Sequence, residues 1–123
     1  MAKHTDTRRY IGKFGVDSGQ VLIGDPCYLG DFVNDDFEPH KQSEDFTYSY
    51  SGACNRTLTD DRAGGIGKFG SMAVVSSTGY GDGVYPVYAT YNEDGRIVKL
   101  EILFEDDGTD AMEGDDEEED DNA

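Results

Sequence analysis

Tryptophan is absent from this 123-residue chain, and cysteine and histidine occur only twice each. Two cysteines, Cys27 and Cys54, cannot build the multi-disulfide framework of a small secreted domain. Together with His4 and His40 they lack the paired spacings of a zinc finger, so a site of that class is excluded. We expect two small packed thiols. A disulfide between them and a reactive or metal-bound thiol are the alternatives.

Long apolar runs are also missing. No stretch approaches the roughly 20 apolar residues that a membrane helix requires. The first ten residues, MAKHTDTRRY, contain basic side chains but no apolar segment like that of a secretory signal. The sequence therefore predicts a cytoplasmic protein that does not contact membranes.

Basic residues are few: ten, against 27 acidic ones, for a formal net charge of −17. Twelve of the acids lie in residues 105–123, which contain no base, so the body of the chain is only mildly acidic. A block of like charge with so little apolar surface predicts a disordered tail. The chain lacks the basic footprint that phosphate binding needs, which excludes direct nucleic-acid binding.

The clearest structural signal lies in residues 77–104, where two runs rich in β-branched and aromatic residues flank Asn92–Gly95. Asp-Gly between such runs is typical of a hairpin. A two-residue loop at Asp94-Gly95 would pair Ala89 with Leu100 and turn an apolar face inward. A type I turn followed by a bulge at Gly95 is the competing register, shifted by one residue.

Other strands are expected at residues 10–16, 20–24, 46–51 (continuing to 58 after a bulge) and 67–77, with a helical turn near 27–33 and a loop at 59–65. Residues 10–24 read as a first hairpin. No helical period is convincing. The prediction is a single all-β domain over 10–104, a small antiparallel sandwich or partly open barrel, preceded by a polar arm at 1–9 and followed by the tail.

Catalytic and metal-binding signals are weak. Cys27 follows a strand and could act as a nucleophile only with His40 as its base, because His4 lies in the polar arm. The acidic loop at 31–36 does not have EF-hand spacing, and the glycine-rich stretches at 63–70 and 79–83 lack a phosphate-binding signature. We predict no catalytic residue, no metal and no cofactor.

Two segments resemble a known family. Residues 79–88, GYGDGVYPVY, followed by Asp94-Gly95-Arg96, are similar to the carboxyl-terminal signature of the DUF4241 family, and 14–19 with 24–26 resemble an earlier element of it. The GDPCY segment at 24–28 is also similar to one in small phage proteins. The family has no established activity. The resemblance implies a fold, and it draws attention to a set of candidate binding residues: Asp17, Asp25, Cys27, Tyr28, Tyr80, Asp82 and Tyr85.

The function predicted first is a non-enzymatic binding protein of phage or bacterial origin that engages a basic protein partner, with its acidic tail steering the encounter. The alternatives are a binder of a small polar or nucleotide-like metabolite at the Asp25 and Asp82 loops, and an enzyme using Cys27 and His40. A dimer through an exposed edge strand stays open.

Overall fold

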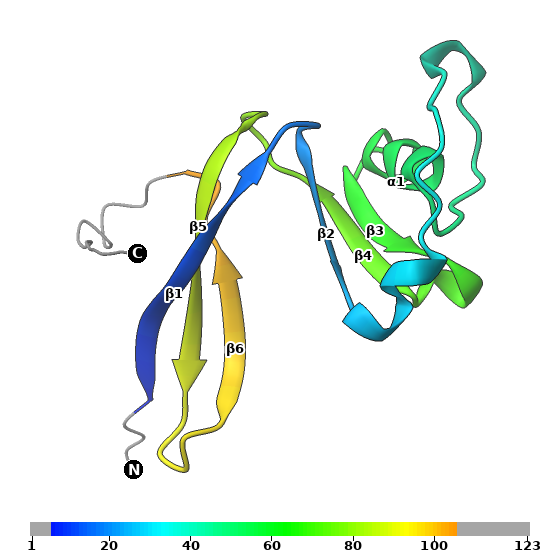
Figure 1. The fold of residues 1–123 in the computed structure, drawn as a ribbon. Coiled ribbons are helices and arrows are strands. Elements are labelled where there is room, and N and C mark those ends of the chain that lie inside the picture. Colours follow the sequence, from blue (N-terminus) through cyan, green and yellow to red (C-terminus); the bar gives the residue numbers. More distant parts are fainter. Residues whose placement is uncertain (1–5, 106–123) are drawn as a thin grey trace. The chain divides into compact units, whose positions relative to one another are not determined.

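The structure, a computed structural model, describes residues 6–105 (Figure 1). Residues 1–5 and 106–123, with His4 and nearly all of the predicted tail, lie outside the described part. The described residues form two compact units, residues 6–16 with 83–105 and residues 17–82, and each is considered by itself. The all-β class is confirmed: two antiparallel three-stranded sheets, which are not closed, carry most of the regular structure. The predicted domain boundaries stay a prediction.

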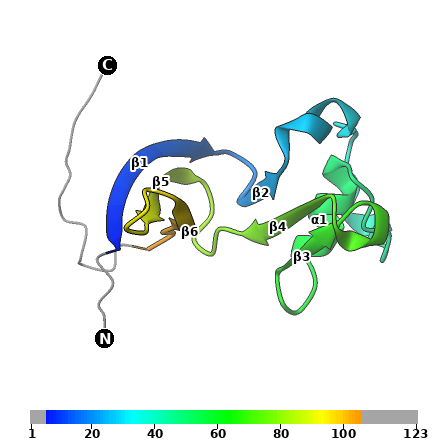
Figure 2. The same ribbon diagram turned by 90° about the horizontal axis from the view of Figure 1, so that it is seen from below.

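The first unit is a sheet in the order β1-β5-β6, formed by β1 (Thr7–Val16), β5 (Gly83–Tyr91) and β6 (Ile97–Ile102). Strand β1 begins inside the predicted polar arm. Arg8 lies 3.9 Å from the centre of the Tyr88 ring and donates to Glu101 at 2.8 Å, which connects the two outer strands across β5. The pairing of β1 shifts between Tyr10 and Gly12, and the strand curves along its length (Figure 2).

The β5–β6 hairpin contains both predicted registers. At the turn, the Gly95 N–H donates to the Asn92 carbonyl at 3.0 Å, and Gly95 has a φ of 80°, as the bulged type I turn requires. An irregularity between Thr90 and Tyr91 then shifts the pairing by one residue. Beyond it Ala89 pairs with Leu100, as the two-residue loop predicted.

A proline in the central strand has a local explanation. The Leu103 N–H donates to the Pro86 carbonyl at 3.3 Å, just past the end of β6. Proline can accept this bond but cannot return one, because it has no N–H. Its missing donor therefore falls where the ladder between β5 and β6 is already ending, and the sheet tolerates it.

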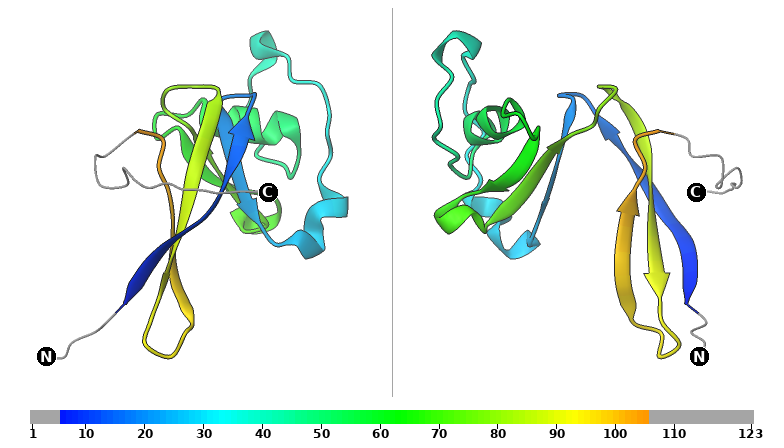
Figure 3. Two further views of the ribbon diagram at one scale, coloured as in Figure 1. Left: turned by 60° about the vertical axis from the view of Figure 1, so that its left-hand side comes forward. Right: turned by 180° about the vertical axis from the view of Figure 1, so that it is seen from behind.

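The second unit is a sheet in the order β2-β4-β3 with one helix on it (Figure 3). Its strands are β2 (Gln20–Gly24), β3 (Ala63–Ile66) and β4 (Ala73–Ser77), and α1 (Tyr50–Thr57) packs against β3 and β4. The buried apolar core lies between them and consists of Tyr48, Ala53, Ile66, Ala73 and Val75. Because each layer supplies only a few of these side chains, the core is small.

Within residues 6–105 there are also three short 3₁₀ helices: η1 (Pro26–Asp31), η2 (Pro39–Lys41) and η3 (Lys68–Gly70). The helical turn predicted near 27–33 is confirmed by η1. The Asp25 carboxylate begins it by accepting the Cys27 N–H at 2.9 Å. Within residues 6–105, no helix is long and apolar enough to cross a membrane.

The predicted first hairpin at 10–24 is wrong. Strand β1 pairs with β5, and β2 pairs with β4, so the two belong to different sheets. Asp17–Gly19 does form a bend, as its composition predicts. The apolar β5 and β4 provide longer or better matched partners farther along the chain, and a turn signal alone does not identify which strands pair.

The predicted strand over 46–58 is also wrong, because α1 occupies its second half. The Ser49 hydroxyl accepts the Gly52 N–H at 2.9 Å and begins the helix, in the way N-cap residues do. A side chain at Gly52 would overlap the backbone of Thr47, so glycine lets the preceding loop lie directly on α1. The predicted loop at 59–65 and strand at 67–77 are replaced by β3, η3 and β4, in which η3 interrupts the expected run.

Candidate functional site

The residues selected from the sequence do not form one cluster. In the second unit, Gln20 of β2 pairs with Ser77 and Gly24 pairs with Ala73, so the strand separates its two flanking loops. Asp17 lies beside the end where the Thr78 N–H donates to the Gly19 carbonyl, and Tyr80 and Asp82 follow Thr78 on that side. Asp25, Cys27 and Tyr28 lie beyond the opposite end of β2.

Tyr85 belongs to the other unit. Its side chain is buried in the first sheet, with its ring 5.3 Å from that of Phe104 in an edge-to-face arrangement. The buried position makes Tyr85 a packing residue of its sheet.

The two cysteines are free, Cys27 exposed and Cys54 buried. The Cys54 sulfur accepts a hydrogen bond from Gln20 Nε2 at 3.4 Å, and its bond with the Tyr50 hydroxyl raises the pKa of Tyr50. His40 Nε2 lies 3.9 Å from a Glu38 carboxylate oxygen. Within residues 6–105, neither cysteine has a hydrogen bond to His40. The Cys27–His40 pair that the enzyme alternative requires is therefore not assembled in this structure.

A concave site lies where residues 33–47 pass over α1, in the second unit. The Val33 N–H donates to the Tyr48 carbonyl and the Tyr50 N–H donates to the Val33 carbonyl, at 3.2 and 2.9 Å. These bonds return the chain to its starting point and close the segment into a loop. We call this segment the α1 loop.

The first anchor of the α1 loop is at the start of the helix. The Asp35 carboxylate accepts the Ser51 N–H at 2.8 Å, and the Ser51 hydroxyl donates to the Asp36 carbonyl at 2.9 Å. The Ser51 backbone bond stabilises the charged carboxylate and lowers the pKa of Asp35 below its ordinary value. This arm of the loop is thus fixed to a helix terminus whose free N–H groups favour an anion.

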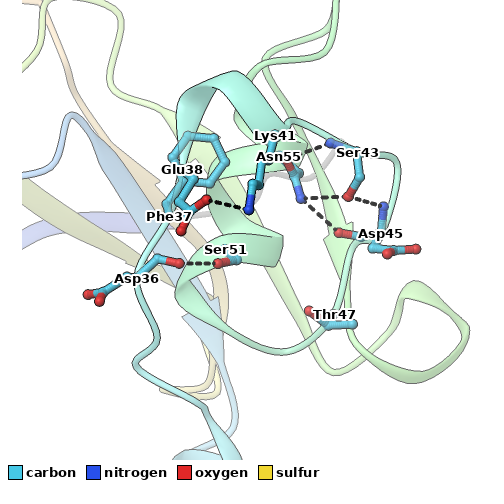
Figure 4. Close-up of a pocket in the computed structure, with 9 residues that line it drawn as sticks. All are labelled: Asp36, Phe37, Glu38, Lys41, Ser43, Asp45, Thr47, Ser51 and Asn55. Atoms are coloured by element: carbon cyan, nitrogen blue, oxygen red, sulfur yellow. Dashed lines mark hydrogen bonds and ion pairs between the residues drawn. The ribbon is translucent and has the colours of Figure 1, made fainter.

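The second anchor is Asn55, which is only 8% exposed. Its Oδ1 accepts the Ser43 N–H, and its Nδ2 donates both to the Ser43 hydroxyl and to the Asp45 carbonyl, each at 3.2 Å (Figure 4). The Asp45 N–H in turn donates to the Ser43 hydroxyl. One buried amide on α1 therefore positions the other arm of the loop.

Between the two arms is a cavity of about 380 Å³. It is lined by Asp36, Phe37, Glu38, Lys41, Ser43, Asp45, Thr47, Ser51 and Asn55. Lys41 Nζ lies 3.2 Å from a Glu38 carboxylate oxygen, so these two charges offset each other. Among the described residues, the carboxylates of Asp36 and Asp45 have no cationic partner, which gives the cavity an excess of negative charge.

The chemistry of the cavity is that of a receptor for a cationic or hydrogen-bond-donating group. Its lining contains carboxylates, hydroxyls and an amide, but no cysteine or histidine that could begin nucleophilic catalysis. In the described part of the chain, no three His, Cys, Asp or Glu side chains are arranged to hold a metal ion. The net negative charge of the lining favours an ammonium or guanidinium group.

The sequence analysis did not identify this cavity. The acidic stretch at 34–36 and the polar stretch at 40–43 both read as solvated loop, and Asn55 lay in an expected strand. Ser49 followed three residues later by Gly52 was a weak sign of a helix start, but the alternation of Phe46–Tyr50 obscured it. Without α1 there is no surface on which the loop can close.

A second exposed feature lies at the turn between β3 and β4. Phe69 is 94% exposed, and its φ of 57° is in the left-handed region that aromatic residues seldom adopt. The side chain adds no packing to the core. The strained backbone conformation lowers the stability of the fold, and the exposed ring offsets none of this loss by packing, so Phe69 is a candidate contact residue.

Comparison with known families gives one match: the model of the DUF4241 family, described as a protein of unknown function, matches residues 7–102. No curated protein and no solved structure matches the chain. The match covers both sheets and the α1 loop. It confirms the resemblance seen at 14–26 and 79–96, and the chain belongs to the DUF4241 family.

Proposed function

We propose that this chain is a non-enzymatic binding domain that engages a basic protein partner, with residues 105–123 accelerating the encounter. In this proposal it acts in the cytoplasm as a phage or bacterial accessory protein. The observation that carries the proposal is the cavity under the α1 loop, whose lining residues include Asp36 and Asp45, two acids without a cationic partner among the described residues. A lysine or arginine side chain of the partner would occupy it.

Two separate contributions follow from the charges. The cavity contributes specificity, because it is shaped by bonds to α1 and admits one side chain. The twelve acids of residues 105–123 contribute long-range attraction, which raises the association rate and weakens as salt screens it. Removing residues 105–123 should slow association at low salt and have less effect at high salt.

The test is affinity capture from a lysate of the organism that encodes the chain, with the retained proteins identified by mass spectrometry. The full chain is compared with Asp36→Asn/Asp45→Asn, which should retain less of the partner. Both residues contribute to the loop through backbone atoms, so neutralising their side chains leaves the anchoring bonds in place.

The matched control is Asp60→Asn/Asp61→Asn, which removes the same charge from an exposed loop outside the cavity. It should retain the partner. Exposed ion pairs contribute about 0.2–1 kcal/mol each. Loss of the two that Asp36 and Asp45 would form with the partner should therefore weaken binding of Asp36→Asn/Asp45→Asn by roughly two- to thirtyfold. If both double variants lost the partner equally, binding would depend on the overall acidity of the chain and not on the cavity. Capture of no basic protein would refute the proposal.

A further inference from the structure

Strand β6 is at the edge of the first sheet, and its apolar side chains are exposed on both faces. Leu100 is 58% exposed, and Ile97 and Val98 are similarly open. An edge strand carries a row of N–H and C=O groups that can pair with another strand, and proteins usually protect such edges. Among the described residues, no strand pairs with the outer side of β6.

The hydrogen-bond phase of β6 identifies which groups face outward. The Leu103 N–H donates to the Pro86 carbonyl, so residues 101 and 99, in step with Leu103, point their backbone groups toward β5. In an antiparallel ladder, alternate residues point the opposite way. Leu100 and Ile102 therefore present their N–H and C=O groups at the free edge.

We propose that the partner of this edge is the β6 strand of a second copy of the chain, in an antiparallel pair centred on Leu100. Residues whose N–H and C=O groups face outward must lie opposite one another in the two copies. The two-fold axis must therefore pass through a residue, which near the middle of β6 means residue 99, 100 or 101. Centring on residue 99 would oppose two lysines, and centring on 101 would oppose two glutamates. Like charges directly opposite each other destabilise a strand pair.

Centring on Leu100 avoids both conflicts. It places Lys99 of each copy opposite Glu101 of the other, and it brings the two Leu100 side chains together. Glu101 is already oriented by its 2.8 Å bond with Arg8. The interface is isologous, so both Lys99–Glu101 pairs form, and the two three-stranded sheets become one of six strands.

The interface is tested with the full chain by sedimentation equilibrium at physiological salt, where repulsion between two chains of charge −17 is screened within roughly 8 Å. We expect a concentration-dependent dimer. Lys99→Glu alone and Glu101→Lys alone should each raise the dimer dissociation constant at least about tenfold, because attraction becomes repulsion at two cross-strand pairs. An equimolar mixture of the two variants should restore dimerisation, since each then opposes the other's charge.

Two further variants separate interface effects from folding. Leu100→Lys opposes two lysines at the two-fold axis and should abolish the dimer, whereas Ile11→Lys, the same change at an exposed position on β1, should leave it intact. Amide exchange followed by NMR shows whether this edge pairs: Leu100 and Ile102 should gain protection as concentration rises, while Lys99 and Glu101 are already protected. A chain that stays monomeric at 1 mM, a dimer unaffected by these variants, or no gain at Leu100 would overturn the proposal.

Discussion

Asn55→Ala is the substitution that most directly tests how the α1 loop is held. The side chain makes three hydrogen bonds to the loop, and a typical intramolecular hydrogen bond contributes about 1 kcal/mol. Alanine has the higher helix propensity, which offsets up to about 0.7 kcal/mol of the lost stability. The exposed loop partners regain water, so no further desolvation cost follows. We expect the free energy of unfolding to fall by about 2 kcal/mol.

Urea denaturation followed by circular dichroism measures this change, and amide exchange at Ser43 shows whether the loop has opened. Ser71→Ala is the control, because it removes one exposed hydrogen bond to the Lys68 carbonyl and should change stability by less than about 0.5 kcal/mol. The reasoning fails if Asn55→Ala is as stable as the control, or if Ser43 stays protected. Either result would mean that other contacts position the loop.

Three further changes follow from the second unit. Ile66 is fully buried, so Ile66→Ala should lower the free energy of unfolding by roughly 2–5 kcal/mol, measured by urea denaturation. Gly52→Ala should destabilise α1 despite the better helix former, because the new methyl group overlaps the Thr47 backbone; a higher melting temperature would contradict this. The pKa of Asp35 is lowered in the folded state, so its carboxylate contributes fully to folding stability above about pH 4. This contribution is lost as pH falls through the folded pKa. The protection of the Ser51 amide against exchange, relative to the unfolded chain, should therefore fall in acid, and Asp35→Asn should remove that pH dependence.

The strands were predictable from sequence where their apolar residues alternate and a glycine marks the turn. The β5–β6 hairpin is the best example, and even its two competing registers both occur, on either side of a bulge. Which distant strands pair was not predictable. Residues 10–16 and 20–24 have the composition of a hairpin, yet they pair with the distant strands β5 and β4.

The cavity was beyond sequence reasoning for a related reason. Phe46–Tyr50 alternates like a strand, and only the Ser49 cap and the close approach at Gly52 make the following residues a helix. Asn55 has no local signal, because its partners lie ten and twelve residues before it. Its role depends on a loop whose closure is a tertiary event.

The most direct test of the proposed function is an NMR titration of the full chain with a hexalysine peptide, with hexaglutamate as the matched probe. The account predicts that hexalysine shifts the amide signals of Ser43, Asp45, Ser51 and Asn55 most, that hexaglutamate does not, and that Asp36→Asn/Asp45→Asn loses the response. Shifts spread evenly over the acidic surface, or an unchanged response in the double variant, would contradict a specific site under the α1 loop.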